Sequence, residues 1–325
     1  MEAVQKVKNL IPLEWKKRFN EIRYNHKPYV LKGNGHRIMI KCPVPPDAPL
    51  DSWGDYHYAL SLANALHRLG CYVRVDFLKH WYNGARRPDE AVLVLRGLEK
   101  YSPVPWNHNL MWVISHPDMV SQAEIERYDH VWAAGHLSGT ETLWQCTDTE
   151  KFNLRHRGPY FRKPLFVGNA RGYTRQIVRD CITAGIDIDI IGAGYEGTPA
   201  EKHVLMKRVP NDKLAIWYAS APVVLNDQHE DMADQGFIPN RIFDATACGA
   251  YVVTAPIQGV NLYEMFGGRV REYRCLEELA HFCSAPLNRV YTATTHTFDA
   301  RAQVIYRKVV ELIDSGRPRL LPETI

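Results

Sequence analysis

Short apolar runs of strand character alternate with amphipathic helical segments along most of this sequence. Residues 36–44 and 71–78 are strand-like, and residues 55–70 between them carry an apolar stripe at helical spacing that ends at Gly70. A strand, a helix and a second strand in this order form a βαβ unit, whose strands are parallel. Further apolar runs follow up to residue 135. The first part of the chain therefore predicts an α/β domain with a parallel sheet buried on both faces.

The alternation then stops and begins again. Residues 148–164 are polar and basic and are interrupted by Gly158 and two prolines, a composition typical of a linker. From residue 165 onward strands and helices alternate a second time, and a last helix is expected at 298–313. The expected fold class is α/β, with two Rossmann-like, doubly wound domains facing a cleft and a helix at the carboxyl end. The predicted limits are residues 1–150 for the first domain, 151–164 for the linker and 165–325 for the second domain.

Length and composition fit two such domains. The chain has 325 residues, 46% of them hydrophobic, which is enough for two full cores. Its formal charge of +4 suits a small anionic ligand and is too small to indicate a surface that binds nucleic acid. Seven cysteines without a C-x-x-C pair favour neither a disulfide framework nor a zinc site. No apolar run reaches membrane-spanning length and no signal peptide is recognisable, so a soluble, cytoplasmic protein is expected.

The amino-terminal segment contains a basic helical pattern. Val4, Val7 and Leu10 recur at helical spacing beside several lysines. The simpler interpretation is a solvated basic face whose other side packs on the domain. The alternative is a helix that lies on an anionic bilayer, as a peripheral contact with the inner face of a membrane.

Ligands of open α/β sheets bind beyond the carboxyl ends of the strands, so the strand-to-helix loops are the expected place for a site. In the first domain that loop covers residues 43–56 and puts Gly54 and Asp55 directly before a helix, where free backbone N–H groups favour a phosphate. Asp55 has a second interpretation as the N-cap of this helix. Neither G-x-G-x-x-G nor a P-loop motif occurs there, so no dinucleotide cofactor is expected.

The second domain has basic residues in the corresponding loops. In "GNARGYTR", Gly168 and Gly172 let the backbone approach a ligand, while Arg171 and Arg175 can donate the paired hydrogen bonds that a diphosphate accepts. Both arginines are equally well interpreted as solvated residues at the start of a helix. Lys207 belongs to a further basic loop at the same end of the sheet.

The stretch "GFIPNRIFDATACGAYVVT", residues 236–254, predicts a helix followed by a strand. If the preceding "PVVLN" is a strand, the helix begins at the ligand end of the sheet. Asn240, Arg241 and Asp244 then lie in its first turns, with Asn240 and Asp244 one helical turn apart on one face. A carboxylate at this place can accept both hydroxyls of a ribose while the helix N-terminus faces the attached phosphates. Ordinary surface charge is the alternative for Asp244.

The strongest signal lies in "VVLNDQHEDMADQGFIPNRIFDATACGAYVVT" (223–254) and "HTFDARAQVI" (296–305). Together these segments resemble the carboxyl-terminal half of glycosyltransferases of the GT-B fold, specifically the family-1-like group that includes the CgeB-type spore-maturation proteins. The resemblance extends over residues 160–313. The segment "LWQCTDTEKF" (143–152) is also similar to the one that closes the first domain of such enzymes.

The resemblance implies that the protein transfers a sugar from a nucleotide diphosphate sugar to an acceptor hydroxyl, without a required metal or other cofactor. In related family-4-type enzymes a glutamate holds the donor ribose at the position of Asp244. The acid expected eight residues earlier has no clear equivalent, because Gly236 stands there. The carboxylates of Glu230, Asp231 and Asp234 are near enough in sequence to replace it.

The same resemblance assigns roles to the loop residues. An inverting reaction needs a base, and "SHPD" after a first-domain strand offers His116 and Asp118, with Asp55 as a third candidate. A structural histidine is the alternative at position 116. Asp187 and Asp189 form a D-x-D pattern at the start of a strand, away from the expected cleft, so no metal site is predicted. The residues predicted to bind the nucleotide sugar are Gly54, Gly168, Asn169, Arg171, Arg175, Lys207, Asn226, Asn240, Arg241 and Asp244.

Three functions remain open at this point. The leading one is a glycosyltransferase that builds a glycan such as a cell-surface polysaccharide. A nucleotide-sugar epimerase shares the two-domain architecture, and a non-catalytic module that binds a nucleotide or a glycan is the third. The donor sugar, its base and the acceptor are open, and the acceptors to consider include lipids, glycans, proteins, small molecules and modified DNA bases.

Overall fold

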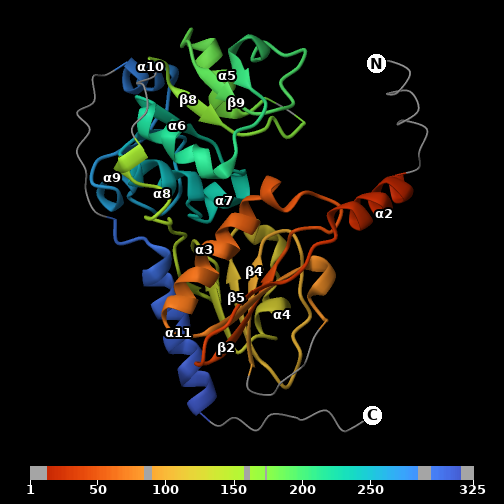
Figure 1. Cartoon of the computed structure of the whole chain (residues 1–325). Coiled ribbons are helices and arrows are strands. Elements are labelled where there is room, and N and C mark those ends of the chain that lie inside the picture. The colour runs from red at the N-terminus through yellow and green to blue at the C-terminus, as the bar shows by residue number, and fades with distance from the viewer. Residues whose placement is uncertain (1–12, 84–89, 157–161, 173, 285–293, 316–325) are drawn as a thin grey trace. The chain divides into compact units, whose positions relative to one another are not determined.

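The computed structural model describes residues 13–83, 90–156, 162–172, 174–284 and 294–315. By contact the chain divides into two compact units (Figure 1). The first unit comprises residues 1–113, 121–131 and 302–325, and the second comprises residues 114–120 and 132–301.

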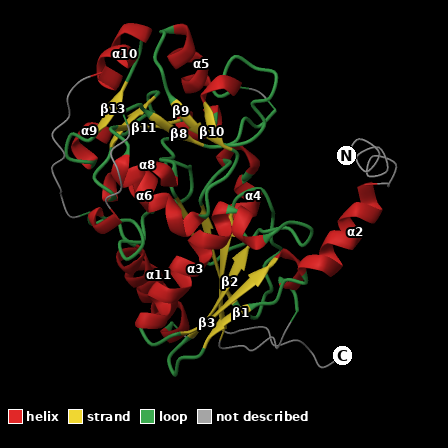
Figure 2. Cartoon of the chain, turned by 45° about the horizontal axis from the view of Figure 1, so that its top comes forward, coloured by secondary structure: helices red, strands yellow, loops and turns green. Residues whose placement is uncertain are grey.

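The first sheet has seven strands in the order β1-β3-β2-β4-β5-β6-β7. Strand β1 is antiparallel to β3, whereas β2 pairs in parallel with both β3 and β4, and β4 pairs in parallel with β5. Figure 2 shows β1, β3 and β2 side by side. The strands are β1 (Tyr29–Leu31), β2 (Arg37–Cys42), β3 (Tyr72–Phe77), β4 (Glu90–Arg96), β5 (His108–Val113), β6 (His130–Ala133) and β7 (Glu141–Thr142).

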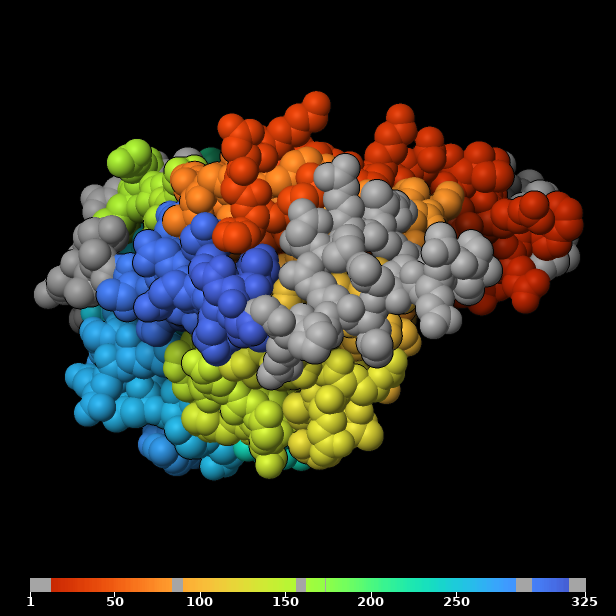
Figure 3. Space-filling model, turned by 90° about the horizontal axis from the view of Figure 1, so that it is seen from below, coloured from red at the N-terminus to blue at the C-terminus, as the bar shows by residue number. Residues whose placement is uncertain are grey.

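Helix α3 (Gly54–Arg68) follows β2 and packs on β2 and β3, so these elements form the predicted βαβ unit. Of its predicted apolar stripe, Ala63 and Leu66 are fully buried, whereas Leu60 is half-buried and Leu69 is 36% exposed. The carboxyl-terminal helix α11 (Phe298–Asp314) lies beside the amino-terminal part of the first unit (Figure 3), where the rings of His36 and Tyr306 are 5.8 Å apart. The other helices of this unit are α2 (Leu13–Tyr24) and the short α4 (Gln122–Ile125), with 3₁₀ turns at Leu50–Ser52 and Leu78–His80.

The second sheet has six strands, and each pair in it is parallel. Its order is β10-β9-β8-β11-β12-β13, which is the doubly wound order 3-2-1-4-5-6 when the strands are numbered along the chain. Successive strands are therefore added toward one edge of the sheet up to β10 and toward the other edge from β11 onward, so the strand order reverses between β8 and β11. The strands are β8 (Leu165–Val167), β9 (Asp189–Ile191), β10 (Val204–Met206), β11 (Val223–Asn226), β12 (Tyr251–Thr254) and β13 (Val270–Glu272).

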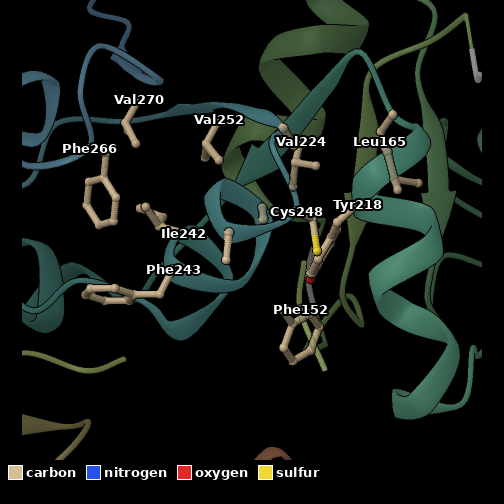
Figure 4. Close-up of a cluster of buried hydrophobic side chains, with 14 of the residues drawn as sticks. Phe152, Leu165, Tyr218, Val224, Ile242, Phe243, Cys248, Val252, Phe266 and Val270 are labelled. Carbon is tan, nitrogen blue, oxygen red and sulfur yellow. The ribbon is translucent and has the colours of Figure 1, made fainter. Parts of the chain in front are cut away.

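Helices cover both faces of the second sheet, as the alternation of buried side chains along each strand requires. On one face, Leu165, Val224 and Val252 pack with α6 (Leu214–Ser220) and α8 (Asn240–Ala247), as Figure 4 shows. On the other face, Phe166 and Leu225 pack with α5 (Gln176–Thr183) and α10 (Leu276–Ser284). The remaining helices are α7 (Glu230–Asp234) and α9 (Leu262–Met265), and 3₁₀ turns occur at Pro117–Met119, Leu154–His156, Glu201–His203 and Asn211–Lys213.

Two interpretations of helix ends are corrected by the structure. Helix α3 begins at Gly54 with Trp53 at its N-cap, so Asp55 lies in the first turn and is not the cap. Arg175, interpreted as a solvated residue at the start of a helix, stands at the N-cap of α5 and is only 3% exposed. The predicted stripe at Val4, Val7 and Leu10 lies outside the described residues and stays a prediction. In the described helix α2, no residue is buried.

The contact-based units differ from the predicted limits at residues 114–120, 132–150 and 302–325. A division by contact does not test the limits of folding domains, so the predicted domain limits stay a prediction. In the predicted linker, residues 157–161 lie outside the described residues.

Candidate functional site

The reversal of strand order between β8 and β11 marks the point of the second sheet where a ligand is expected. Strand β8 leads into Gly168 and Asn169, and β11 ends at Asn226, which is followed by Asp227. The sequence-predicted residues of both loops therefore meet at the carboxyl ends of neighbouring strands.

Arg241 of α8 ties the ends of these two strands together. Its guanidinium donates to the carbonyl oxygen of Val167 at 2.7 Å and to Oδ1 of Asn226 at 2.9 Å. Asn226 is fully buried, and its Nδ2 donates to Oγ1 of Thr254 on β12 at 2.9 Å. The first turn of α8 thus fixes the geometry of three neighbouring strand ends. Arg241 and Asn226 act here as positioning residues.

Arg175 has a similar position on the other loop. Its Nε donates to the carbonyl oxygen of Asn169 at 2.7 Å, and its Nη1 donates to Oδ2 of Asp227 at 2.9 Å. The guanidinium carbons of Arg175 and Arg241 lie 5.8 and 5.2 Å from the centre of the Phe166 ring. Arg175 therefore joins the two loops, which is a different role from the exposed diphosphate contact that the sequence predicts for it.

Close backbone packing also shapes the β8 loop. A Cβ atom on Gly192 would lie 2.1 Å from the carbonyl oxygen of Gly168, so only glycine fits there. The hydroxyl of Tyr195 donates to that same oxygen at 2.9 Å. The side chain of Asn169 accepts a hydrogen bond from the backbone of Ala193 at 3.0 Å. Gly192 and Tyr195 were not predicted from the sequence, because both act through contacts with a loop 24 or more residues away.

Arg171 and His116 converge on His229. Arg171 donates to Nε2 of His229, and the rings of His116 and His229 are 4.9 Å apart. Among the described residues only Asn25, His116 and Arg171 are non-glycine residues with positive φ, at 40°, 53° and 56°. Such conformations are rare and cluster at functional sites. Two of these three residues, His116 and Arg171, contact His229, and this supports a functional site here.

Burial lowers the pKa of His229, and the nearby Arg171 and His116 lower it further. A neutral imidazole can accept the hydrogen bond that Arg171 donates. No sequence pattern singled out His229, although this residue stands three positions after the end of β11, where a functional residue is expected.

A cavity of about 610 Å³ lies beside this histidine, within the range of ligand sites. Asp118 is part of its wall, and Oδ1 of Asp118 accepts a hydrogen bond from Nε2 of Gln235 at 2.5 Å. The three carboxylates that the resemblance offered as replacements for the missing acid all lie on the wall as well. The lining residues are Asp118, Gln176, Arg179, Asp227, Gln228, His229, Glu230, Asp231 and Asp234.

Asp244 lies inside the second unit with both carboxylate oxygens engaged. Oδ1 accepts from Oγ1 of Thr147 at 2.7 Å and Oδ2 accepts from Nδ2 of Asn240 at 2.7 Å. The residue is only 6% exposed. Burial raises the pKa of Asp244 to about 7, against the opposing effects of these two hydrogen bonds and of Lys151. The bland interpretation as surface charge is therefore wrong.

The Asn240 amide completes this arrangement. Its Oδ1 is buried and has no hydrogen-bond partner among the described residues. The two ends of an amide are assigned from the hydrogen-bond network, and turning this amide would present Oδ1 to the carboxyl group. A protonated Asp244 can then donate to Oδ1, so the neutral carboxyl group fits this environment.

The remaining predicted residues are more open. A Cβ atom on Gly54 would meet no other atom within 4 Å, and burial raises the pKa of the neighbouring Asp55. Lys207 is 72% exposed at the side chain and pairs with Glu196 at 2.6 Å. Gly54 and Lys207 therefore have room for a ligand, whereas the Asp55 carboxyl group is largely buried. Among the described residues, the ion-pair partner of Lys207 is Glu196 and the partner of Arg171 is His229, so the structure does not bring Lys207 and Arg171 together.

The D-x-D pattern is occupied by ion pairs. Asp187 lies 2.8 Å from Nζ of Lys163, and Asp189 is the first residue of β9, at the strand end opposite to the site. Within the described ranges, no group of three histidine, cysteine or acidic side chains is arranged to hold a metal ion.

Comparison with known proteins adds two findings. Residues 171–306 match the family model described as glycosyl transferase-like. The structure is similar to that of AviGT4, a glycosyltransferase involved in avilamycin A biosynthesis, with a TM-score of 0.56 and 14% identity over 87% of this chain and 99% of that one. The chain has the GT-B fold.

Two trehalose-phosphate synthases of Burkholderia are also similar to this GT-B chain. The enzymes of B. multivorans and B. vietnamiensis have TM-scores of 0.52 and 0.51, each with 9% identity over 87% of this chain and 100% of the other. No curated protein matches the sequence. The predicted α/β class with two Rossmann-like sheets is confirmed, and the family match and the fold together support a glycosyltransferase.

The part of the GT-B chain that matches the family model includes Arg171, His229, Arg241 and Asp244, as well as every lining residue of the cavity except Asp118. In the part of the chain that the structure describes, no helix has the length and apolarity needed to cross a bilayer.

Proposed function

We propose that this protein transfers a sugar from a nucleotide diphosphate sugar to an acceptor hydroxyl. The observation that carries the proposal is the cluster of Arg171, Arg241 and His229 beside a cavity at the switch point of the second sheet. This cluster lies within the segment that matches the glycosyl transferase-like family model. The GT-B fold agrees with the same function.

The phosphates of the donor would lie at the carboxyl ends of β8 and β11. In this proposal Arg171 donates to the diphosphate and exchanges its present partner His229 for it. The N-terminus of α8 at Asn240 and the backbone at Gly168 face the same charge. As the diphosphate leaves, its negative charge increases, and fixed donors stabilise this state more than the bound donor.

Arg175 and Arg241 support this arrangement indirectly, because each holds two loops in place through the contacts described above. Lys207 remains a proposed phosphate contact. Its ion pair with Glu196 is solvent-exposed, and such pairs hold a side chain weakly, so Lys207 can turn toward a ligand.

The sugar and the ribose need acceptors of hydrogen bonds. We propose that Glu230, Asp231 and Asp234 on the cavity wall accept the hydroxyls of the transferred sugar. The ribose is assigned to Asp244, each of whose oxygens accepts one hydrogen bond already and has capacity for a second. This assignment requires a ligand to reach a nearly buried group, so the affinity of an Asp244 variant decides it.

The proton of the acceptor hydroxyl requires a base if the reaction inverts the sugar carbon. His116 and Asp118 are the proposed candidates in the second unit, since His116 contacts His229 and Asp118 is on the cavity wall. Asp55 is the candidate in the first unit, where we propose that the open turn at Gly54 takes part in binding the nucleotide sugar. Burial raises the pKa of Asp55, which is the direction that strengthens a carboxylate as a base.

The finer assignments rest on the sequence resemblance. They are membership of the CgeB-type group, a role in the biosynthesis of a glycan such as a cell-surface polysaccharide, and activity without a metal or other cofactor. A cytoplasmic location with a peripheral contact at the inner face of the membrane is also proposed, from the composition of the sequence and its basic amino-terminal pattern. The acceptor hydroxyl is proposed without a choice between glycan, lipid, protein, small molecule and modified DNA base.

The test is an incubation of the full chain with a panel of nucleotide diphosphate sugars. Release of free nucleotide that depends on an added hydroxyl acceptor, with sugar found on that acceptor, is the expected result. Consumption of a donor into an isomeric nucleotide sugar without acceptor would identify an epimerase instead. Tight nucleotide binding with no turnover of any donor would leave a binding module.

A further inference from the structure

Helix α2 (Leu13–Tyr24) exposes four large apolar side chains, and three of them lie along one side, with Leu13 projecting to the other. Trp15, Phe19 and Ile22 are 71%, 66% and 72% exposed, and none of the twelve residues of the helix is buried. The three positions follow the spacing i, i+4, i+7, so they form one stripe. Figures 1 and 2 both show α2 extending away from the first sheet. Isolated exposed apolar residues are ordinary, but a continuous stripe of this size marks an interaction surface.

The stripe faces away from the point where α2 joins the first unit. The ring of Tyr24 lies 6.2 Å from the ring of His26, which is itself 6.0 Å from the ring of Phe77 on β3. At 100° per residue, Tyr24 is on the opposite side of the helix from the stripe. The end of α2 is therefore attached through Tyr24, while Trp15, Phe19 and Ile22 are presented outward.

Basic residues flank the stripe more closely than acidic residues do. On the same helical projection Arg18 flanks the stripe on one side, and Lys16 and Arg23 flank it on the other. Glu14 and Glu21 lie beyond Arg18, and Lys17 projects to the side opposite the stripe. The outward face of α2 is thus apolar in the middle and positive at both margins.

We propose that this face docks on the surface of an anionic phospholipid bilayer. A helix in the plane of a bilayer buries its apolar stripe at the level of the headgroups, where tryptophan is favoured, and its basic margins contact the lipid phosphates. Each basic residue near an anionic surface strengthens binding about fivefold. This charge pattern favours lipid over a second copy of the chain, because two such faces would bring equal charges together.

The inference names the residues for the peripheral contact in the proposed function, and it is independent of the sugar-transfer chemistry. Its experiment is co-sedimentation of the full chain with vesicles of phosphatidylcholine alone and of equal parts phosphatidylcholine and phosphatidylserine. The variants are the double substitution Trp15→Ala with Phe19→Ala, and Arg18→Glu. The matched control is Tyr263→Ala, which removes an aromatic residue that is 55% exposed in the second unit.

The full chain and the Tyr263→Ala control are expected to bind the anionic vesicles and to bind the neutral vesicles much more weakly. The double variant should lose at least about tenfold in vesicle affinity, since two apolar side chains no longer enter the interface. Arg18→Glu should weaken binding to the anionic vesicles only.

Two results would overturn the proposal. One is no binding to anionic vesicles, and the other is a double variant that binds them as well as the full chain. Self-association of the full chain that the double variant abolishes, without vesicle binding, would assign the stripe to a second copy and also contradict a lipid surface. The thermal shift with nucleoside diphosphates, measured on the same proteins, reports on the sugar-transfer proposal separately.

Discussion

Thr147 and Asp244, 97 residues apart in the chain, share a buried hydrogen bond of 2.7 Å between Oγ1 and Oδ1. The other oxygen of Asp244 accepts from Asn240, one helical turn earlier. The carboxyl group that the sequence places at the ligand end of α8 is therefore also part of the internal structure of the second unit. Predictions for this residue concern both stability and binding.

The raised pKa of Asp244 makes the free energy of unfolding depend on pH. Below about pH 4 the carboxyl group is protonated in both folded and unfolded chains, and its contribution is fully present. As the pH rises toward 7, the unfolded chain has released this proton while the folded chain still holds it, so stability falls. Between these limits the loss from this one group is at most about 4 kcal/mol.

Asp244→Asn removes this titration and retains the shape of the side chain. We expect the melting temperature of the variant to rise relative to that of the wild type between pH 4 and pH 8. The control is Asp212→Asn, because the Asp212 side chain is 67% exposed. A difference between Asp244→Asn and wild type that stays constant across this pH range would contradict a raised pKa.

Asp244→Ala tests the proposed ribose contact. It should weaken the binding of a nucleoside diphosphate and leave the fold intact, which titration calorimetry and circular dichroism would measure. Loss of one hydrogen-bonded carboxylate contact predicts about a tenfold decrease in affinity. Unchanged affinity would exclude Asp244 from the binding site. Its role would then be structural, through its hydrogen bonds with Thr147 and Asn240.

Gly192→Ala should destabilise the second unit by about 1–3 kcal/mol, because the added methyl group would collide with the backbone of Gly168. Gly54→Ala is the matched control, since a Cβ atom there meets nothing and alanine is favoured at a helix start. Thermal unfolding of both variants checks this. Equal stability of the two would show that the β8 loop can move away from β9.

The alternation of strand and helix segments predicted the fold class because both sheets bury apolar residues at regular spacing. The same pattern placed Gly168, Asn226 and Asn240 at strand ends and at a helix start, where the structure has them. These features depend on local sequence. They need no knowledge of distant contacts.

Features that depend on distant contacts were not predictable in this way. His229 acquires its place from Arg171 and His116, which are 58 and 113 residues away in sequence. The buried state of Asp244 depends on Thr147, and the N-cap interpretation of Asp55 was wrong because the chain turns into α3 at Trp53. Helix spacing near the amino terminus indicated a basic helix, but only the structure shows that the apolar side chains of Trp15, Phe19 and Ile22 on α2 are exposed.

Binding of nucleoside diphosphates to the wild-type chain and to Arg171→Ala tests the central claim most directly, with the corresponding nucleosides as ligands for comparison. The account predicts that one diphosphate binds the wild type, that Arg171→Ala weakens this binding at least about tenfold, and that the nucleoside binds both proteins alike. Failure of every diphosphate to bind, or an equal loss of affinity for nucleoside and diphosphate in the variant, would contradict a nucleotide sugar site at the switch point of the second sheet.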